Sequence, residues 1–226
     1  MSNDELELAN EKYGLAYYPE KWWDRLFAPA GNVAMITSVD DQGTVNAASF
    51  ATCVRVVHNP VQICFTTAAE GQTVRNIEQT GEFVVNLPHH EKELLEKVRV
   101  VGLPFEKGVN ELDKAGLTAI PSMTVAPPRI ADCWRHFECE VVWIHEWIGR
   151  KMVMGNVRAC SIRTELVAEH GYIKWDLAKP TTWAGQQYVD LFAQQFPVMQ
   201  VGIPYEGPEN TRTDAEWKEL IDNREK

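Results

Sequence analysis

The stretch EGQTVRNIEQTGEFVVNLP, Glu70–Pro88, joins a polar segment with helical character to an apolar segment with strand character. Glycines stand at both ends of the polar segment, at positions 71 and 81, and glycine commonly ends a helix. A short helix over 71–81 and a strand over EFVVN are therefore predicted. The rest of the fold is built around this pair.

The start of this predicted helix can hold an anion. The first N–H groups of a helix have no partner within it and carry partial positive charge, so a phosphate can bind there without a lysine. Thr67 and Thr73 would add hydroxyl donors, and Arg75 would add a positive charge if it points back. The alternative is purely structural: Thr73 caps the helix, and Asn76 is a solvated surface residue.

Strand-like runs surround the central stretch. NVAMITSVDDQGTVNAASF indicates two strands about the turn at 40–43, VQICFTT a third, and RHFECEVVWIHEW with KMVMGNVRACSIRTEL a long hairpin joined at 148–150. GYIKWD is expected to be a last short strand. Six or seven short strands in adjacent hairpins favour a mainly β fold, an antiparallel barrel with peripheral helices. A Rossmann fold is excluded because no G-x-G-x-x-G follows a strand and opens a helix.

Three further helices are expected. PEKWWDRLF (19–27) can form a short one, HHEKELLEKVRVVG an amphipathic surface helix, and AKPTTWAGQQYVDLFAQQF leads from a loop into the third. The chain is expected to divide into an N-terminal arm with its short helix (1–29), a barrel domain (30–200) and a polar tail (201–226). Residues 102–128, rich in Gly and Pro, would be an irregular excursion from the barrel.

Charge and composition narrow the function classes. The chain has 22 Lys and Arg against 32 Asp and Glu, a net charge of −10, which argues against nucleic-acid or anionic membrane partners. No apolar run reaches the length of a membrane span, and the acidic N-terminus lacks the order of a signal peptide, so a cytoplasmic location is expected. Five dispersed cysteines without a C-x-x-C pair indicate buried thiols rather than disulfides or a zinc site.

Four pieces of the sequence, in this order, resemble the flavin reductase-like family, whose members have an FMN-binding split barrel. NAASF (46–50) followed by Asn59-Pro60 resembles the family strand that begins Asn-x-Ala-Pro-Phe and runs on to Asp-Pro-Pro. GQTVRNIEQTGEFVVN resembles its Lys-Asp-Thr-x-x-Asn-Ile helix and the Gly-Glu-Phe-Val-Val-Asn strand. HFECEV resembles its strand containing Leu-Glu-Cys, and TWAGQQYVDL its closing glycine-rich loop and tyrosine. The resemblance covers roughly residues 30–190.

The resemblance implies a homodimer that binds FMN near the subunit boundary. The phosphate would lie at Thr67, Thr73 and the helix start, and the flat ring along residues 46–52, where small side chains leave it room. Residues 183–188 would close over the ring, and Phe50 is expected to be buried on the opposite face of its strand. The residues implied at the cofactor are Asn46, Ala48, Ser49, Phe50, Ala51, Thr52, Thr66, Thr67, Gln72, Thr73, Asn76, Trp183 and Tyr188.

The chain departs from the family pattern at several positions. Ser49 and Ala51 stand where the family often has Pro and then Ser, and Gly71-Gln72 replaces its Lys-Asp. The closing loop has one glycine, Gly185, rather than several. Arg55 stands where the family is usually uncharged, and it either replaces the missing lysine or faces a substrate.

No catalytic residue is fixed by the sequence, because hydride transfer from a nicotinamide to a flavin requires no acid–base group. His58, His136 and Arg55 are the candidates for a role beside the ring. The adjacent His89 and His90 would point about 100° apart on a helix, so no metal site is predicted there.

Three functions remain open at this point. The first is an FMN-dependent oxidoreductase that uses NADH or NADPH and passes electrons to flavin, to a partner monooxygenase or to a small molecule. The second is an FMN-dependent enzyme for one specific small, even aromatic, substrate, without flavin reductase activity. The third is a non-catalytic flavin or haem protein for electron transfer or redox sensing, with His58 or His136 as an axial ligand.

Overall fold

The computed structural model describes residues 31–106, 108–167, 173–186 and 190–195, together with Leu15 and Glu20. The rest of the N-terminal arm with its expected helix, Tyr188 and the tail from 201 lie outside the described residues. The expected domain bounds therefore stay a prediction.

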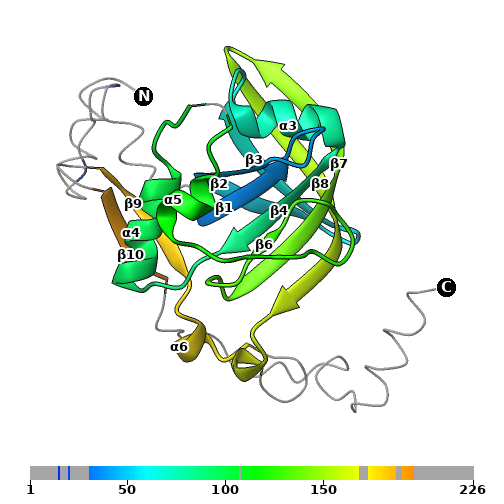
Figure 1. The fold of residues 1–226 in the computed structure, drawn as a ribbon. Helices are drawn as coiled ribbons and strands as arrows, with labels where there is room; N and C mark the ends of the chain where they lie inside the picture. The colour runs from blue at the N-terminus through cyan, green and yellow to red at the C-terminus, as the bar shows by residue number, and fades with distance from the viewer. Residues whose placement is uncertain are drawn as a thin grey trace, which may run out of the picture. The chain divides into compact units, whose positions relative to one another are not determined.

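The main sheet closes on itself into a six-stranded antiparallel barrel (Figure 1). The strand order around the barrel is β1-β2-β3-β8-β7-β4, and β4 pairs back onto β1, with Ile36 opposite Val85. This is the mainly β fold with an antiparallel barrel that the sequence predicts. The strands are β1 (Asn32–Val39), β2 (Val45–His58), β3 (Val61–Ala68), β4 (Glu82–Leu87), β7 (Arg135–Trp147) and β8 (Arg150–Ile162).

Apolar side chains fill the barrel interior. Successive side chains of a strand point to opposite faces, so every second residue faces inward. The Phe65 ring lies 5.0 Å from that of Phe50 and 5.4 Å from that of Phe83, measured between centroids. Helix α3 (Gln72–Thr80) lies across one end of the barrel and adds Val74 and Ile77 to this core (Figure 1). The predicted helix thus closes that end, and its first turn lies at the barrel rim.

A second apolar cluster covers the outward faces of β1 and β2. Helix α4 (Lys92–Val101) is the predicted amphipathic helix, and its apolar side chains at 94, 95, 98 and 101 are all buried. Helix α5 (Glu111–Ala115) adds Leu112 to the same cluster. Among the described residues, no helix has both the length and the apolar character needed to cross a membrane.

The expected helix after the closing loop is wrong. Residues Thr181–Gln186 and Asp190–Gln194 form strands β9 and β10, which pair as an antiparallel hairpin. Trp183 and Phe192 lie opposite each other in this hairpin and pack against the second cluster. Burial of these two aromatic side chains on a sheet outweighs the helical spacing of the sequence. The hairpin joins the barrel where Thr182 pairs with Asn32 of β1.

The expected last strand, GYIKWD, is also wrong over its described part. Residues Trp175–Ala178 form a short helix, α6, and Ile173 makes only an isolated bridge with Val167. Trp175 packs against Trp134, with ring centroids 6.3 Å apart. The single helical turn of α6 is enough to place the Trp175 ring against the core, so the described part of this segment forms no strand.

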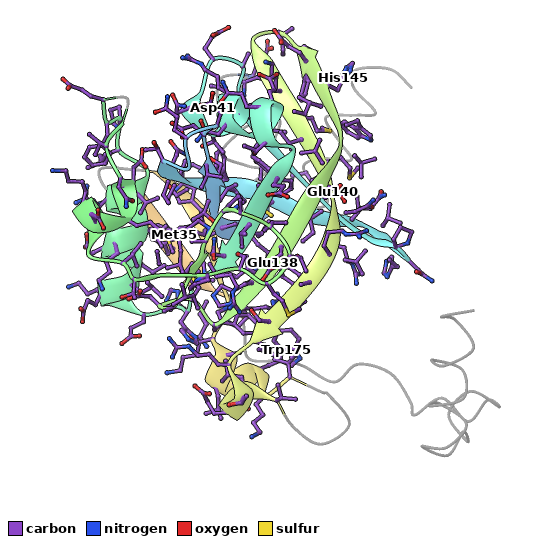
Figure 2. All side chains as sticks on the ribbon, turned by 45° about the vertical axis from the view of Figure 1, so that its right-hand side comes forward. Met35, Asp41, Glu138, Glu140, His145 and Trp175 are labelled. Carbon is purple, nitrogen blue, oxygen red and sulfur yellow. The ribbon has the colours of Figure 1, made fainter. Side chains whose placement is uncertain are left out.

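One buried carboxylate holds the excursion at 102–128 against the barrel. Besides α5, the described part of this segment contains only β5 (Ala119–Ile120), which pairs with β6 (Arg129–Ile130). Glu138 of β7, 2% exposed, accepts hydrogen bonds from the Met123 and Thr124 N–H groups at 2.7–3.0 Å. Figure 2 shows Glu138 on the part of β7 that this segment crosses. Burial favours the neutral acid, but these hydrogen bonds outweigh it and lower the pKa of Glu138.

Candidate functional site

Four polar side chains meet between α3 and the barrel rim. Asn46 Nδ2 donates to the Thr73 hydroxyl at 3.1 Å and to the Ser38 hydroxyl at 3.4 Å, and Asn76 Nδ2 donates to Ser38 at 3.2 Å. All four side chains are buried. Gln72 Nε2 extends the network by donating to Asn76 Oδ1 at 2.6 Å. Ser38, Asn46, Thr73 and Asn76 are called the polar cluster below.

Both parts of the purely structural alternative for this helix are wrong. The N-cap residue is Gly71, which has no side chain to accept a hydrogen bond from the start of α3, so Thr73 is not the cap. Asn76 is only 1% exposed, so it is not a surface residue. A helix start that no side chain caps is open to an acceptor from outside the helix.

A cavity of about 280 Å³ opens beside the polar cluster. It is called the amide cavity because Asn46, Gln72 and Asn76 line it, together with Arg75 of α3. Its walls also include the turn after β1 and the first part of the excursion. The remaining lining residues are Asp40, Thr44, Val45, Glu70, Phe105, Glu106, Gly108, Val109 and Glu111.

The charges in the amide cavity are unevenly divided. Among its described lining residues, one guanidinium faces four carboxylates. Arg75 lies 3.7 Å from the Glu70 carboxylate and also donates to the Glu70 carbonyl oxygen. The amides and the helix start therefore supply most of the cavity's capacity for an anion, and the carboxylates oppose it.

A second cavity, of about 470 Å³, lies on the outward face of β2 and is called the strand cavity. Ser49 and Ala51 present small side chains on one side of it, and Trp183 of β9 stands on another. The Trp183 indole N–H donates to Asp190 at 3.4 Å, which fixes the ring at the cavity wall. The other lining residues are Val33, Phe50, Val98, Arg99, Gly102, Leu103, Asp190 and Phe192.

The stretch of β2 between the two cavities touches both outer helices. Glu111 of α5 accepts a hydrogen bond from the Ala47 N–H at 2.9 Å. At the end of α4, a Cβ atom on Gly102 would lie only 2.5 Å from Ser49 Oγ, so glycine is what allows this close approach. The face of β2 that was expected to hold the ring is thus covered by Glu111 at Ala47 and open to the strand cavity at Ser49 and Ala51.

The predicted cofactor residues lie in several different places. Asn46, Gln72 and Asn76 line the amide cavity, and Ser49, Ala51 and Trp183 line the strand cavity. Phe50 turns its ring into the barrel interior as expected, and Ala48, two residues before it, lies opposite core residue Ile36. Thr73 is in the polar cluster. Tyr188 lies outside the described residues.

Three of the predicted threonines make hydrogen bonds within the sheet. Thr52 Oγ1 donates to the Thr66 carbonyl oxygen at 3.3 Å and accepts from the Thr66 N–H at 3.1 Å, so the Thr52 side chain joins β2 to the backbone of β3. Thr67 is buried and donates to the Ala68 carbonyl oxygen at 3.4 Å. These three residues line neither the amide cavity nor the strand cavity.

The catalytic candidates lie away from both cavities. His136 is buried, with Nε2 at 2.8 Å from the Ile130 carbonyl oxygen and Nδ1 at 3.0 Å from the Ser161 hydroxyl. Burial lowers its pKa, so it is a neutral structural residue with both nitrogens engaged. His58 is exposed beside Arg55, at 3.4 Å, near the far end of β2 from α3. Arg55 therefore does not stand in for the family's lysine at α3.

Sequence reasoning missed several residues of the site. Ser38 joins the polar cluster because it faces inward at the end of β1, two residues beyond the core residue Ile36. A lone polar residue on the core side of a strand was the available signal. Arg99, Asp190 and Phe192 reach the strand cavity only through the packing of α4 and β10, which no local pattern shows.

Comparison with known proteins gives one family. The sequence model of the flavin reductase like domain matches residues 28–191. An uncharacterised protein of Methanothermobacter thermautotrophicus is 37% identical over 155 residues, covering 65% of this chain and 70% of its own length.

Two solved structures show how far the fold extends. The 2-nitrobenzoate 2-nitroreductase of Pseudomonas fluorescens superposes with a TM-score of 0.71 at 24% identity, over 87% of this chain and 96% of that one. Component B of nitrilotriacetate monooxygenase from Bacillus cereus superposes with a TM-score of 0.68 at 25% identity, over 81% of this chain and 98% of that one.

Proposed function

Because the chain belongs to the flavin reductase like domain family, we propose that it is an FMN-dependent oxidoreductase that takes electrons from NADH or NADPH. One observation carries the proposal: the chain combines two features on neighbouring elements. The start of α3 is uncapped and lies beside buried amide side chains at the amide cavity, and β2 presents small side chains to the strand cavity. The first suits a phosphate, and the second suits a flat ring.

The phosphate would be held at the amide cavity. The N–H groups of the first turn of α3 supply donors, and Gln72 and Arg75 add side-chain donors from the same turn. Asn76 and Asn46 are held rigidly by the polar cluster, so they are preorganised for a ligand. These residues fit a phosphate by donor type, although Glu70 and Glu106 lie in the same cavity.

The ring would lie in the strand cavity. Ser49 and Ala51 leave its face unobstructed, and Trp183 covers it from β9. The Ala47 N–H is a backbone donor for a polar ring edge, and Glu111 occupies it in this structure, so the ligand and Glu111 compete for it. When bound, FMN supplies the hydride-accepting and electron-transfer chemistry.

Because of the carboxylates in the amide cavity, FMN is expected to bind weakly. Four negative side chains around a doubly charged phosphate oppose its binding, and only Arg75 among the described lining residues opposes them. The flavin then exchanges with solution. Free flavin, a partner monooxygenase or a small molecule can be the electron acceptor of such a protein.

A homodimer is part of the proposal. The projecting end of the β7–β8 hairpin, where His145 is labelled in Figure 2, bears exposed apolar side chains. Trp143 is 39% exposed, Trp147 36% and Ile148 89%. A second copy that covers these side chains removes apolar surface from water.

The test is spectroscopic. The purified protein is titrated with FMN while flavin fluorescence and absorbance are followed, and the complex is then mixed with NADH or NADPH without oxygen. Saturable binding followed by bleaching of the flavin absorbance is expected. Failure to bind FMN would overturn the proposal as a whole. Binding without bleaching by either coenzyme would leave a flavoprotein but remove the nicotinamide-dependent activity.

A further inference from the structure

A third cavity, of about 450 Å³, lies inside the barrel at the end opposite α3. Strand register fixes this position, because its β3 and β4 residues, Ile63 and Leu87, lie at the ends of those strands that are farthest from the helix. It is called the barrel-mouth cavity. Its lining residues are Asn32, Cys53, Val54, Arg55, Val61, Ile63, Val85, Leu87, Arg135 and Phe137.

Arg135 lies in this cavity, and among the described residues no polar side chain pairs with it. Its guanidinium carbon is 4.4 Å from the centroid of the Trp134 ring and 5.2 Å from that of the Phe137 ring. Its Nε atom is buried and makes no hydrogen bond within the described part of the chain. The aromatic rings hold the guanidinium in place, but they do not satisfy the donors that a guanidinium presents.

The described walls of the cavity offer no counter-charge: none of the ten described lining residues is a carboxylate. Burial raises the pKa of the Cys53 thiol to about 12, so this side chain is uncharged at neutral pH. Arg55, on the exposed rim, has His58 as its only polar side-chain contact among the described residues. A half-buried cation with unfilled donors is costly unless an anion completes it.

We propose that the barrel-mouth cavity is a binding site for a small organic carboxylate with an apolar body. The cavity has two guanidinium groups, that of Arg135 deep inside it and that of Arg55 at its rim. The N–H groups of a planar guanidinium can donate to both oxygens of a carboxylate. Val85, Leu87 and Phe137 supply an apolar surface for the rest of the molecule. The apolar walls favour such a ligand over inorganic phosphate, which would leave them in contact with water.

This site does not depend on the proposed flavin chemistry. It shares β2 with the strand cavity, but its residues on that strand begin at Cys53, beyond Ala51. Binding there is therefore measured with the full-length protein both alone and saturated with FMN, and the same result is expected in both states.

The experiment compares benzoate with benzamide, a neutral molecule of nearly the same shape, by isothermal titration calorimetry. Benzoate is expected to bind at one site per chain, and benzamide at least about tenfold more weakly, because it lacks the charge that the guanidinium groups recognise. Arg135→Gln should weaken benzoate binding by about tenfold or more. Arg55→Gln, a change on the exposed rim that leaves the fold intact, should weaken it by about two- to fivefold.

Arg158→Gln is the matched control, because Arg158 is an exposed residue of β8 that pairs with Glu140 and lines no part of the cavity. It should leave benzoate binding unchanged. The proposal is overturned if the wild-type protein does not bind benzoate, or if benzamide binds equally well. It is also overturned if Arg55→Gln and Arg158→Gln have the same effect.

Discussion

Buried amide side chains, rather than lysines, position the start of α3. Asn76 holds the helix to β1 through Ser38, and Asn46 holds it to β2 through Thr73. These hydrogen bonds are hidden from water, so the first turn of α3 keeps a fixed place. Asn86 acts in the same way near the end of β4: it donates to the Met35 carbonyl oxygen and accepts from the Ile130 N–H. Leaving such a buried donor without an acceptor is costly, which makes these contacts testable one at a time.

Thr73→Val should weaken FMN binding and lower stability. The change removes the acceptor that Asn46 uses at 3.1 Å, so we expect a loss of about 1 kcal/mol in the free energy of unfolding. FMN titration and urea denaturation measure the two effects. Thr80→Val is the control, because Thr80 lies in the last turn of α3 and does not line the amide cavity or the strand cavity. Equal FMN affinity in the two variants would contradict the placement of the phosphate.

Arg75→Gln and Glu106→Gln should shift FMN affinity in opposite directions. Both residues are exposed side chains in the amide cavity, one attractive and one repulsive for a phosphate. Each partly screened charge is worth about 0.2–1 kcal/mol, so Arg75→Gln should raise the Kd and Glu106→Gln lower it, each by up to about fivefold. Titrations at low and high salt check this. A shift in the same direction for both variants would argue against a charged group in this cavity.

Glu138→Gln should loosen the excursion and flatten the acid side of the stability profile. The folded pKa of Glu138 lies below the unfolded value of about 4.3. Its stabilisation is therefore complete above that value and is lost as the pH falls through the folded pKa. Urea denaturation between pH 7 and pH 3 should show a loss of about 2 kcal/mol for the variant at pH 7 and a smaller loss at pH 3. An equal loss at both values would refute it.

At the scale of elements, local patterns sufficed where one face of a segment meets one core. Helices α3 and α4 have this form, and both were predicted. Strands β1 to β4 were also predicted, but from apolar runs between turn residues, because β1 and β4 are buried on both faces. The pattern failed for β9–β10 and for α6, where one or two aromatic anchors decide the conformation. The cavities themselves depend on contacts between distant segments, such as Gly102 with Ser49, and no spacing rule reveals them.

Gly155→Ala tests how tightly the barrel interior is packed. A Cβ atom at this position of β8 would lie 2.6 Å from the Phe83 ring. We expect a loss of about 1–3 kcal/mol in the free energy of unfolding, because the core has no room for the methyl group. Combining it with Phe83→Leu should recover part of that loss. Strict additivity of the two changes in a double-mutant cycle would show that the two residues do not meet.

At the scale of the whole molecule, the β7–β8 hairpin carries a feature that reduces its own stability. Ile148 has a φ of 43°, a left-handed conformation that a β-branched residue rarely adopts, and its side chain is 89% exposed. A two-residue turn with positive φ at both positions favours Asn at position 148, followed by Gly149. An exposed isoleucine in this position makes sense if a second copy of the chain covers it.

Ile148→Asn should therefore stabilise the single chain and weaken the dimer. Relief of the left-handed strain should add about 1 kcal/mol to the free energy of unfolding measured on dilute, monomeric protein. Sedimentation velocity over a range of concentrations should show a higher dissociation constant than for the wild type. Leu177→Asn is the control, since Leu177 is 57% exposed on α6, outside the hairpin. Identical association in the Ile148 and Leu177 variants would exclude the hairpin from the interface.

The outer edge of β1 is shared between two partners, since residues 35–37 pair with β4 and Asn32 alone pairs with β9. The hairpin that bears Trp183 is thus attached to the closed cylinder by a very short seam. The β9–β10 hairpin can therefore move relative to the barrel without breaking the hydrogen bonds between the barrel strands. Access to the strand cavity and the stability of the barrel are then independent of each other. Amide hydrogens of β9 and β10 should accordingly exchange with deuterium much sooner than those of β1 and β4.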